Sequence, residues 1–479
     1  MTPLRLSEIA RMTGGRLSGD DATVAALMTD TRILPESAVP ALFVALKGEN
    51  FDGHDHVVAA ADAGVTAALV AREVKAPIAQ VVVADTQRAL ADLAAAIQHG
   101  RSTRVVAITG SNGKTSVKAL LLAILQQHVG PDQVYANPGN RNNEIGLPLA
   151  VIDAPDDVRF AIYEMGAGKP GDIAYLTAVA RPDVALVNNI APAHLERMGS
   201  LRVVAETKAA VYDALAADGV AVINADDAFG PWFAQRLQAD AADAADVPRL
   251  IRFGLEASAD ISARGIQIGP DGSRFVLVTA DGEIDVRIAL PGRHNVLNAL
   301  AAACMALGLG VPLATIAAGL ATAPTVAGRL VSHALRSRAV LIDDSYNANP
   351  GSLNAAIDTL AASRGRGEAW LVLGDMRELG DAAEAMHADA GLRAKAAGLS
   401  RLYTLGPLSA AAAAAFGRDA HHYDRHADLA QALAADIRAH AQPGLRVLVK
   451  GSRGSAMDRI VAAVVADDST FAGDDINAA

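Results

Sequence analysis

The chain has 479 residues, of which 51% are hydrophobic and 4% aromatic, and its formal net charge at pH 7 is −11. A chain of this length is expected to form two to four domains, and its net negative charge argues against a nucleic-acid-binding surface. The single cysteine, Cys304, has no partner for an internal disulfide bond, so we expect a reducing, cytoplasmic location. The N-terminal residues contain no apolar segment of a secretory signal.

The order of the predicted elements divides the chain into three α/β units. Residues 1–103 contain short strands and turns, and the segment ALFVALKGENFDGHDH at 41–56 has the form of a strand followed by a ligand-binding loop. In residues 104–326 strands alternate with helices, which predicts a doubly wound parallel sheet, and a hairpin is expected at Asp281-Gly282. Residues 327–479 again alternate strands with Ala-rich helices, so we expect a further sheet of their own.

One segment is long enough to suggest a membrane span. Residues 297–328 contain no charged side chain, but they are mostly alanine and are interrupted by Gly308 to Pro312. Two short buried helices joined by a turn explain this composition better, and we expect no membrane insertion.

The most informative motif is RVVAITGSNGKTS, at 104–116. Its β-branched run predicts a buried strand, Gly110 and Gly113 break the strand, and Lys114 begins an apolar helix that extends to about His128. A glycine turn followed by a helix N-terminus can bind phosphate through backbone N–H groups, a lysine can reach the outer phosphates, and Thr115 can bind Mg²⁺. The spacing is G-x-x-G-K-T, and a plain glycine turn is the alternative that Lys-Thr at the helix start disfavours.

Three further residues are candidates for metal or nucleotide chemistry. Glu164 follows the strand VRFAIYE, where a carboxylate can bind Mg²⁺, although a simple loop carboxylate is the alternative. His194, in NNIAPAHLE, follows another strand, and its local sequence leaves open a metal ligand or a structural histidine. Lys208 lies on a predicted helix, where a solvated charge is the ordinary interpretation.

Polar groups recur at helix and strand ends in the second half of the chain. Asn295 and Asn298 share one face of a predicted helix, and they could bind a purine edge or be satisfied core amides. Three predicted strands of the last unit end in the polar motifs DDSYNANP, GDMRELG and KGSRG. Because the carboxyl ends of parallel strands meet at one edge of a sheet, these motifs predict a ligand site there.

Together these motifs resemble the Mur ligase family, and most of all its members that add D-alanyl-D-alanine to UDP-N-acetylmuramoyl-tripeptide. The pair DSYNANP and GDMRELG is the part most suggestive of those members. The matching segments span nearly the whole chain: TDTR, LFVALKGENFDGHD, TGSNGKTSVK, NPGNRNNEIGLPL, EMGAG, NNIAPAHLERMGS, ETK, GRHNVLNA, GRL, DDSYNANPGSL, GDMRELG and KGSRG.

The resemblance implies an α/β protein of three domains: a small UDP-sugar-binding domain at 1–103, a central P-loop ATPase domain with a mostly parallel sheet at 104–326, and a C-terminal Rossmann-like domain at 327–479 for nucleotide and amine. It implies amide formation in peptidoglycan precursor synthesis, in which the terminal carboxylate of the acceptor attacks the γ-phosphate of ATP and forms an acyl phosphate. The dipeptide amine then displaces phosphate. The implied cofactors are ATP, two Mg²⁺ ions and a carbamylated lysine, and we expect a monomer.

The resemblance also implies roles for individual residues. Expected to be catalytic are Lys114, Lys208 and His194. Expected at ATP are Gly110, Ser111, Asn112, Gly113, Lys114, Thr115, Ser116, Asn295, Arg329 and Asp344. Expected at Mg²⁺ are Thr115, Glu164, His194 and Lys208 as a carbamate. Expected at the substrates are Thr31, Arg32, Lys47 and Gly48 for the UDP-sugar, Asn140, Asn142 and Asn143 for the acceptor, and Asn347, Asn349 and Asp375 for the dipeptide.

Other functions have to be weighed against this one. A sister ligase could add a single amino acid, such as diaminopimelate or lysine, and a folylpolyglutamate synthetase-like ligase is related. The diaminopimelate enzyme carries a D-[ND]-P-R motif, which this sequence lacks. A non-catalytic nucleotide-binding scaffold is disfavoured by the intact set of Lys114, Thr115, Glu164, His194 and Lys208. The third residue of the acceptor peptide, diaminopimelate or lysine, is not specified by the sequence. Tyr346 stands where some sister ligases have a lysine.

Overall fold

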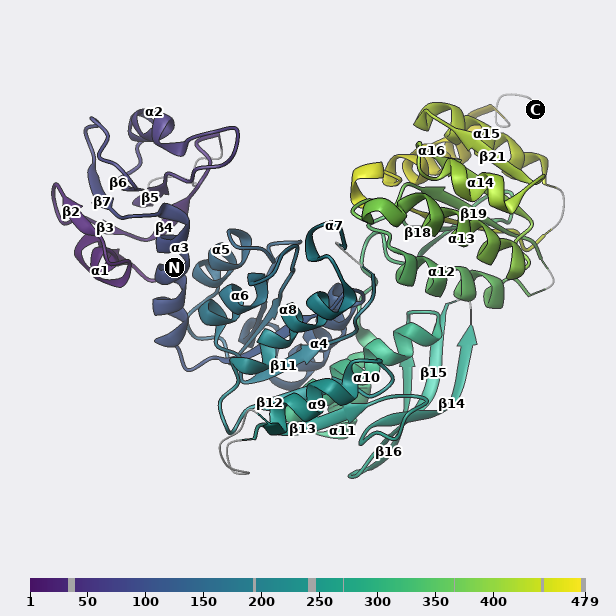
Figure 1. Ribbon diagram of the computed structural model, residues 1–479, viewed down its shortest axis with the longest axis horizontal. Coiled ribbons are helices and arrows are strands. Elements are labelled where there is room, and N and C mark those ends of the chain that lie inside the picture. The colour runs from purple at the N-terminus through teal and green to yellow at the C-terminus, as the bar shows by residue number, and fades with distance from the viewer. Residues whose placement is uncertain are drawn as a thin grey trace.

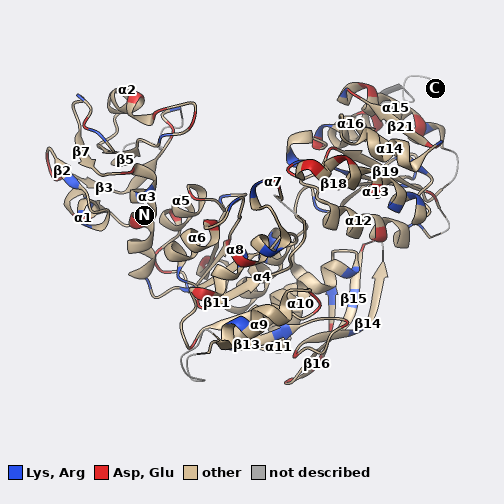
Figure 2. Cartoon of the chain, in the orientation of Figure 1, with Lys and Arg blue, Asp and Glu red and all other residues tan. Residues whose placement is uncertain are grey.

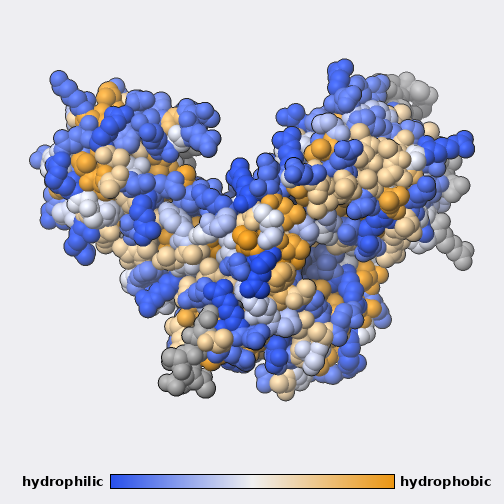
Figure 3. Space-filling model, viewed as in Figure 1, coloured by the Kyte–Doolittle hydropathy of each residue, from blue (hydrophilic) through white to orange (hydrophobic). Residues whose placement is uncertain are grey.

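The computed structural model describes residues 1–32, 39–192, 195–239, 247–269, 271–365, 367–440 and 443–474. The chain forms three lobes, and the first and last lie on either side of the central one (Figure 1). The space-filling view shows a wide gap between these two outer lobes (Figure 3). Acidic and basic residues are interspersed along the chain in all three lobes (Figure 2).

The first lobe is built on a five-stranded sheet in which only β2 is antiparallel to its neighbour. One face packs against α1 and α3, and the other packs against α2, because alternate strand residues point to opposite faces. Helix α3 also packs against α5 and α6 of the central lobe, so the two lobes share one hydrophobic core. The elements are β1 (Leu4–Arg5), α1 (Leu6–Met12), β2 (Arg16–Ser18), β3 (Thr23–Val24), β4 (Ala26–Met28), β5 (Ala41–Val44), α2 (Val57–Asp62), β6 (Ala67–Val70), β7 (Ala79–Val82) and α3 (Thr86–His99).

The central lobe contains a six-stranded parallel sheet in the order β13-β12-β11-β8-β10-β9. After β8 the chain builds β9 and β10 on one side, then crosses to build β11, β12 and β13 on the other. The strand order therefore reverses at β8, and such switch points are where open α/β sheets bind ligands. The strands are β8 (Arg104–Thr109), β9 (Val134–Ala136), β10 (Phe160–Glu164), β11 (Val184–Val187), β12 (Val220–Asn224) and β13 (Arg249–Phe253).

Helices cover both faces of this sheet, which confirms the doubly wound prediction. Helices α4, α10 and α11 share a core with one face, and α3, α5, α6 and α8 share a core with the other. The uncharged segment at 297–328 forms most of α10 and all of α11, with a turn between them, as predicted. The remaining elements are α4 (Lys114–Val129), α5 (Gly146–Asp153), α6 (Asp172–Ala180), α7 (Leu195–Met198), α8 (Leu201–Asp213), α9 (Gly230–Ala239), β14 (Ser262–Gly269), β15 (Gly272–Thr279), β16 (Gly282–Ile288), α10 (Arg293–Gly308) and α11 (Leu313–Thr322).

Strands β14, β15 and β16 form a separate antiparallel sheet, and the predicted hairpin at Asp281-Gly282 connects the last two. Among the described residues, no helix is both long enough and apolar enough to cross a membrane.

The last lobe has a second six-stranded sheet, ordered β17-β18-β22-β19-β20-β21, in which only β17 is antiparallel. Helices α12, α13 and α14 cover one face, and α15 and α16 cover the other. The three-part α/β fold is confirmed, while the boundaries at 103 and 326 stay predictions. The elements are β17 (Val331–Ala334), β18 (Val340–Asp344), α12 (Pro350–Ser363), β19 (Ala369–Gly374), α13 (Ala383–Ala396), β20 (Arg401–Leu405), α14 (Ala410–Phe416), β21 (Ala420–Tyr423), α15 (His426–Ala439), β22 (Arg446–Lys450) and α16 (Asp458–Asp474).

Close packing of α11 on α4 gives a first prediction. A Cβ atom at Gly319 would overlap the backbone of Ile124, which no rotamer change can relieve. Although alanine favours a helix over glycine by about 1 kcal/mol, we expect Gly319→Ala to lower the free energy of unfolding by about 1–3 kcal/mol, measured by urea denaturation. The exposed Ala318→Leu is the control, and equal stability of both variants would contradict this packing.

Candidate active site

A cavity of about 720 Å³ lies where the central and last lobes meet. Its walls are the loop between β8 and α4, the segments that follow β10 and β11, the start of α10 and the carboxyl ends of β18 and β22. Most of the residues predicted for ATP, metal and acceptor line it: Gly110, Ser111, Asn112, Gly113, Lys114, Thr115, Ser116, Asn140, Asn142, Asn143, Glu164, Lys208, Asn295, Arg329, Asp344, Asn347 and Asn349.

The loop between β8 and α4 has the glycine-dependent conformation that the motif predicts. Gly113 has φ +80°, and a Cβ atom there would lie 2.5 Å from both Asn188 Nδ2 and Asn298 Oδ1. Lys114 begins α4, and its Nζ donates to the carbonyl oxygen of Gly110 at 2.7 Å. The lysine is thus folded back over its own loop, at the N-terminus of a helix, which is the arrangement that binds phosphate groups.

Asparagine side chains hold this loop to α10 and to the segment that follows β11. Asn298 Nδ2 donates to Asn295 Oδ1 at 3.0 Å, and Asn188 Nδ2 donates to Asn298 Oδ1 at 3.0 Å. Asn188 and Asn189 both donate to the carbonyl oxygen of Asn112, at 2.9 and 3.1 Å. We call these five residues the asparagine network. Of the two alternatives for Asn298, a purine contact and a satisfied core amide, the structure shows the core amide, bonded to Asn188 and Asn295.

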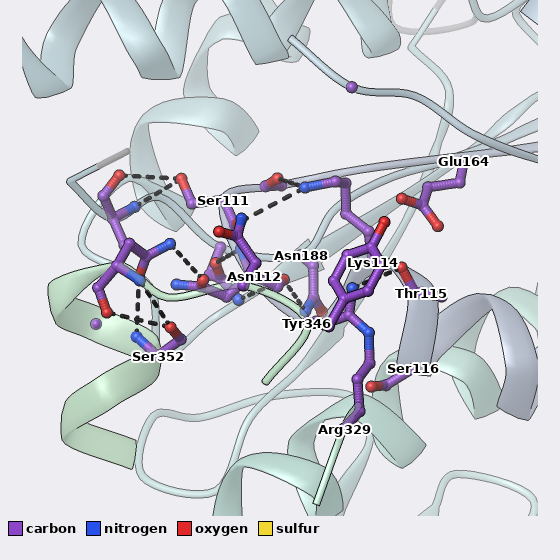
Figure 4. Close-up of a pocket in the computed structure, with 18 of the residues that line it drawn as sticks. Ser111, Asn112, Lys114, Thr115, Ser116, Glu164, Asn188, Arg329, Tyr346 and Ser352 are labelled. Carbon is purple, nitrogen blue, oxygen red and sulfur yellow. Dashed lines mark hydrogen bonds between the residues drawn. The ribbon is translucent and has the colours of Figure 1, made fainter. Parts of the chain in front are cut away.

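The last lobe touches the phosphate-binding loop directly. Arg329 Nη2 donates to Thr115 Oγ1 at 3.0 Å, and the Arg329 guanidinium lies 4.6 Å from the centre of the Tyr346 ring (Figure 4). Asn349 Nδ2 donates to Asn112 Oδ1 at 2.7 Å. The two hydrogen bonds join residues more than 200 positions apart, so the cavity is a composite of two lobes.

Glu164 is the buried carboxylate of the cavity, with 4% of its surface exposed. Burial opposes its charge, but Lys118 and Lys114 outweigh that effect and lower the pKa of Glu164 below its usual value. Asn142 Nδ2 donates to Oε1 at 3.0 Å, whereas Oε2 is buried and accepts no hydrogen bond. A free carboxylate oxygen near the Thr115 hydroxyl is a donor set that suits Mg²⁺.

Lys208 is 3% exposed on α8, so the solvated helix charge that its local sequence favoured is wrong. The face of the helix that carries it packs inward, and the side chain lines the cavity. Burial, together with the nearby positive charge of Lys114, lowers the pKa of Lys208 to about 7. Burial likewise lowers the pKa of Lys114, and Arg329 adds to the shift while Glu164 opposes it.

A buried ion pair lies on the wall of the cavity that the last lobe contributes. Asp344 and Lys450 are the last residues of adjacent parallel strands, and Lys450 Nζ lies 2.6 Å from Asp344 Oδ2. Lys450 also donates to the carbonyl oxygen of Asn347 at 2.9 Å. Across the cavity, burial and then Lys450 lower the pKa of His294 to about 4. The pairing of Lys450 with Asp344 could not be predicted, because the sequence does not reveal that β18 and β22 are neighbours.

Several predicted residues lie elsewhere. Thr31, Arg32, Lys47 and Gly48 belong to the first lobe and do not line the cavity, and Arg32 pairs with Asp30. Asp375 does not line it either, since its buried carboxylate accepts from the backbone N–H of Ser409 at 2.8 Å. His194 lies outside the described residues. Among the described residues, no cluster of three His, Cys, Asp or Glu side chains could hold a metal.

A glycine loop at a helix N-terminus, a buried carboxylate oxygen without a hydrogen bond and a buried lysine lie around one cavity, and such groups are suited to a nucleotide and its metal ion. Family models identify the class of protein: residues 108–306 match the Mur ligase middle domain, and residues 328–453 match the Mur ligase, glutamate ligase domain. The chain therefore belongs to the Mur ligase family.

The similarity extends over the whole chain. The chain is 40% identical to a UDP-N-acetylmuramoyl-tripeptide–D-alanyl-D-alanine ligase of Escherichia coli, over 97% of this chain and 99% of that protein. Its structure matches a crystal structure of MurF from Acinetobacter baumannii with a TM-score of 0.89 at 31% identity, covering 97% and 99% of the two chains. It also matches MurF from Thermotoga maritima in complex with ADP, with a TM-score of 0.81 at 27% identity, covering 94% and 99%.

The environment of His294 gives a second prediction. Because its folded-state pKa is about 4 and that of an unfolded histidine is about 6.5, only the unfolded chain takes up this proton between those values. Stability should therefore fall as the pH falls from 6.5 to 4, with a slope from this residue of at most about 1.4 kcal/mol per pH unit. His294→Gln should flatten the pH dependence of urea unfolding, whereas the exposed His99→Gln should not. An unchanged slope in His294→Gln would contradict the assignment.

Proposed function

We propose that this chain is an ATP-dependent ligase that joins D-alanyl-D-alanine to UDP-N-acetylmuramoyl-tripeptide during peptidoglycan precursor synthesis. The observation that carries the proposal is the composite cavity, in which the phosphate-binding loop of the central lobe faces Arg329, Asp344 and Asn349 of the last lobe. A nucleotide held between two such walls presents its γ-phosphate to substrates from both lobes. The 40% identity to a ligase of that name over nearly the full length supports this choice of substrates.

The loop residues are suited to bind the ATP phosphates. The backbone N–H groups at the start of α4 and the Lys114 ammonium face the same space, and both favour the charge that spreads over the transferring phosphoryl group. We assign Arg329 and Asp344 to the nucleotide from the opposite wall, and Asn295 to the adenine side of the cavity. Arg329 would have to exchange its hydrogen bond to Thr115 for one to phosphate.

Thr115 and Glu164 are the residues best placed to hold Mg²⁺, which supplies neutralisation of charge on the phosphates. We assign a second ion to His194 and to Lys208 in its carbamylated form. A neutral lysine amine can attack the carbon of CO₂ and lose a proton, which gives an anionic carbamate with oxygen donors. Lys208 is buried and has a pKa of about 7, so about half of its amines are neutral at that pH.

The reaction then needs two displacements. A carboxylate oxygen of the acceptor attacks the γ-phosphorus, the bond to the β,γ-bridging oxygen breaks, and an acyl phosphate and ADP result. The amine of the dipeptide attacks the acyl carbon and loses a proton, and phosphate leaves with the former carboxylate oxygen. Lys114 stabilises the phosphoryl oxygens in the first step, and enclosure between the lobes excludes water from the acyl phosphate.

The substrates are assigned by lobe. The UDP-sugar is expected at Thr31, Arg32, Lys47 and Gly48, and the acceptor peptide would extend past Asn140, Asn142 and Asn143 into the cavity. Asn347 and Asn349 are the remaining candidates for the dipeptide, because both line the cavity and Asp375 does not. The cytoplasmic location and the monomeric state stay predictions.

The choice of amine is the third prediction and tests the function itself. With ATP, Mg²⁺ and UDP-N-acetylmuramoyl-tripeptide, we expect phosphate release on addition of D-alanyl-D-alanine and much less with D-alanine, diaminopimelate, lysine or glutamate. A coupled phosphate assay measures this, with product mass as the control for ligation. Equal turnover with a single amino acid would indicate a sister ligase, and binding of ATP without any turnover would indicate a scaffold.

Lys208 gives the fourth prediction. We expect Lys208→Ala to lower kcat by a factor of about 100 or more, because the oxygen donors assigned to the second Mg²⁺, which neutralises charge on the phosphates, are lost. Millimolar acetate should restore part of the activity by filling the vacated space. The comparison variant is Lys395→Ala on the solvent-exposed side of α13, which should keep full activity. Near-native turnover of Lys208→Ala without added carboxylate would remove the carbamate from this account.

A further inference from the structure

Lys118 is a buried cation to which the proposed reaction gives no role. It lies one helical turn after Lys114 on α4 and is 7% exposed. Its Nζ donates to the carbonyl oxygens of Asn137 and Gly139, at 2.9 and 3.3 Å, and lies 3.4 Å from Glu164 Oε2. The ammonium group therefore uses two of its three donors on one segment and faces a carboxylate of another as an ion pair.

The first of these segments is the loop 137–143, which follows β9 and contains the asparagines assigned to the acceptor. Asn137 is 1% exposed and binds both backbone groups of Glu164: its Oδ1 accepts from Glu164 N–H at 2.9 Å, and its Nδ2 donates to Glu164 C=O at 3.0 Å. The backbone N–H of Gly166 donates to the carbonyl oxygen of Asn142 at 2.8 Å. The loop and the end of β10 are therefore one hydrogen-bonded unit.

The second segment is the Glu164 side chain itself. Asn142 occupies Oε1, while Lys118 approaches Oε2 without making a hydrogen bond of good geometry. Lys118 thus compensates the charge of the carboxylate and leaves an oxygen lone pair available. Removing one partner of a buried ion pair leaves the other charge uncompensated, so the Glu164 carboxylate would no longer be held in this position.

We infer that Lys118 is a positioning residue that couples the metal-binding carboxylate of Glu164 to the acceptor-contacting loop 137–143. The carboxylate and the loop both contact the same ammonium group. Among the described residues, no other lysine or arginine forms an ion pair with Glu164. Binding of the acceptor against the loop and binding of Mg²⁺ at Glu164 therefore reinforce each other. The part that concerns the acceptor depends on the proposed function, whereas the part that concerns Mg²⁺ does not.

The test is Lys118→Met, with Arg101→Met as the matched control. Arg101 lies between α3 and β8, and its buried side chain also binds two carbonyl groups, of Val151 and Ala154, and one carboxylate, of Asp156. None of these partners lines the cavity, whereas Glu164, the partner of Lys118, does. Circular dichroism first establishes that each variant is folded. Binding of a fluorescent, non-hydrolysable ATP analogue is then titrated with Mg²⁺, which needs no turnover.

We expect Lys118→Met to raise the Mg²⁺ concentration for half-maximal binding by about 10- to 100-fold, as is usual when a residue that orients a metal ligand is lost. Arg101→Met should leave this midpoint unchanged, and binding in EDTA should be equal in all proteins. Lys118→Gln, which keeps an N–H donor but no charge, should show the same shift as Lys118→Met. On the background of Glu164→Gln, Lys118→Met should have no further effect.

In turnover assays, Lys118→Met should raise KM for the UDP-linked acceptor and leave KM for D-alanyl-D-alanine unchanged. A Mg²⁺ midpoint in Lys118→Met no different from that in Arg101→Met would overturn the inference, and so would additive effects of Lys118→Met and Glu164→Gln. If the wild-type chain binds the analogue but ligates no amine, the proposed function fails while the Mg²⁺ titration still decides the role of Lys118.

Discussion

An excess of positive charge enclosed at the carboxyl end of β8 and β10 is the constraint on which the site depends. Lys114, Lys208 and Arg329 line the cavity there, and Lys114 and Lys118 both act on the buried carboxylate of Glu164. Burial is the main cause that lowers the pKa of both Lys114 and Lys208, and the charge of Lys114 adds to the shift of Lys208. A polyanion that enters the cavity relieves the repulsion between these cations. The same imbalance therefore favours a nucleotide triphosphate and a neutral Lys208 amine.

Neutral amides, rather than charges, hold this cationic centre in place. The asparagine network joins α10, the segment after β11 and the phosphate-binding loop, and Asn349 extends it to the last lobe. Each amide supplies donors and an acceptor without adding charge, and the backbone N–H groups of Ser111 and Asn112 are themselves bonded to Asn189, so the loop is fixed by neutral groups. The close approach of Asn188 and Asn298 also explains why position 113 must be glycine.

The sequence predicted those features that depend on local geometry. The strand, glycine turn and helix of the phosphate-binding loop follow from residue type and spacing, and Glu164 follows from its place at the end of a buried strand. The burial of Lys208 could not be predicted locally, because the packing of α8 decides which face is covered. The pairing of Lys450 with Asp344 depends on strand order, which short motifs do not encode. Not every polar residue at a strand end belongs to the ligand site. The Asp375 carboxylate, which follows β19, instead accepts from Ser409 of the same lobe.

The central claim is that the cavity transfers a phosphoryl group to a carboxylate before the amide forms. Turnover with an acceptor whose terminal carboxylate is labelled with ¹⁸O tests it most directly, with the released phosphate analysed by mass spectrometry. The account predicts that each phosphate carries one labelled oxygen, because the oxygen that attacked phosphorus leaves with it. Unlabelled phosphate, released at the same rate as amide product, would contradict the acyl-phosphate route.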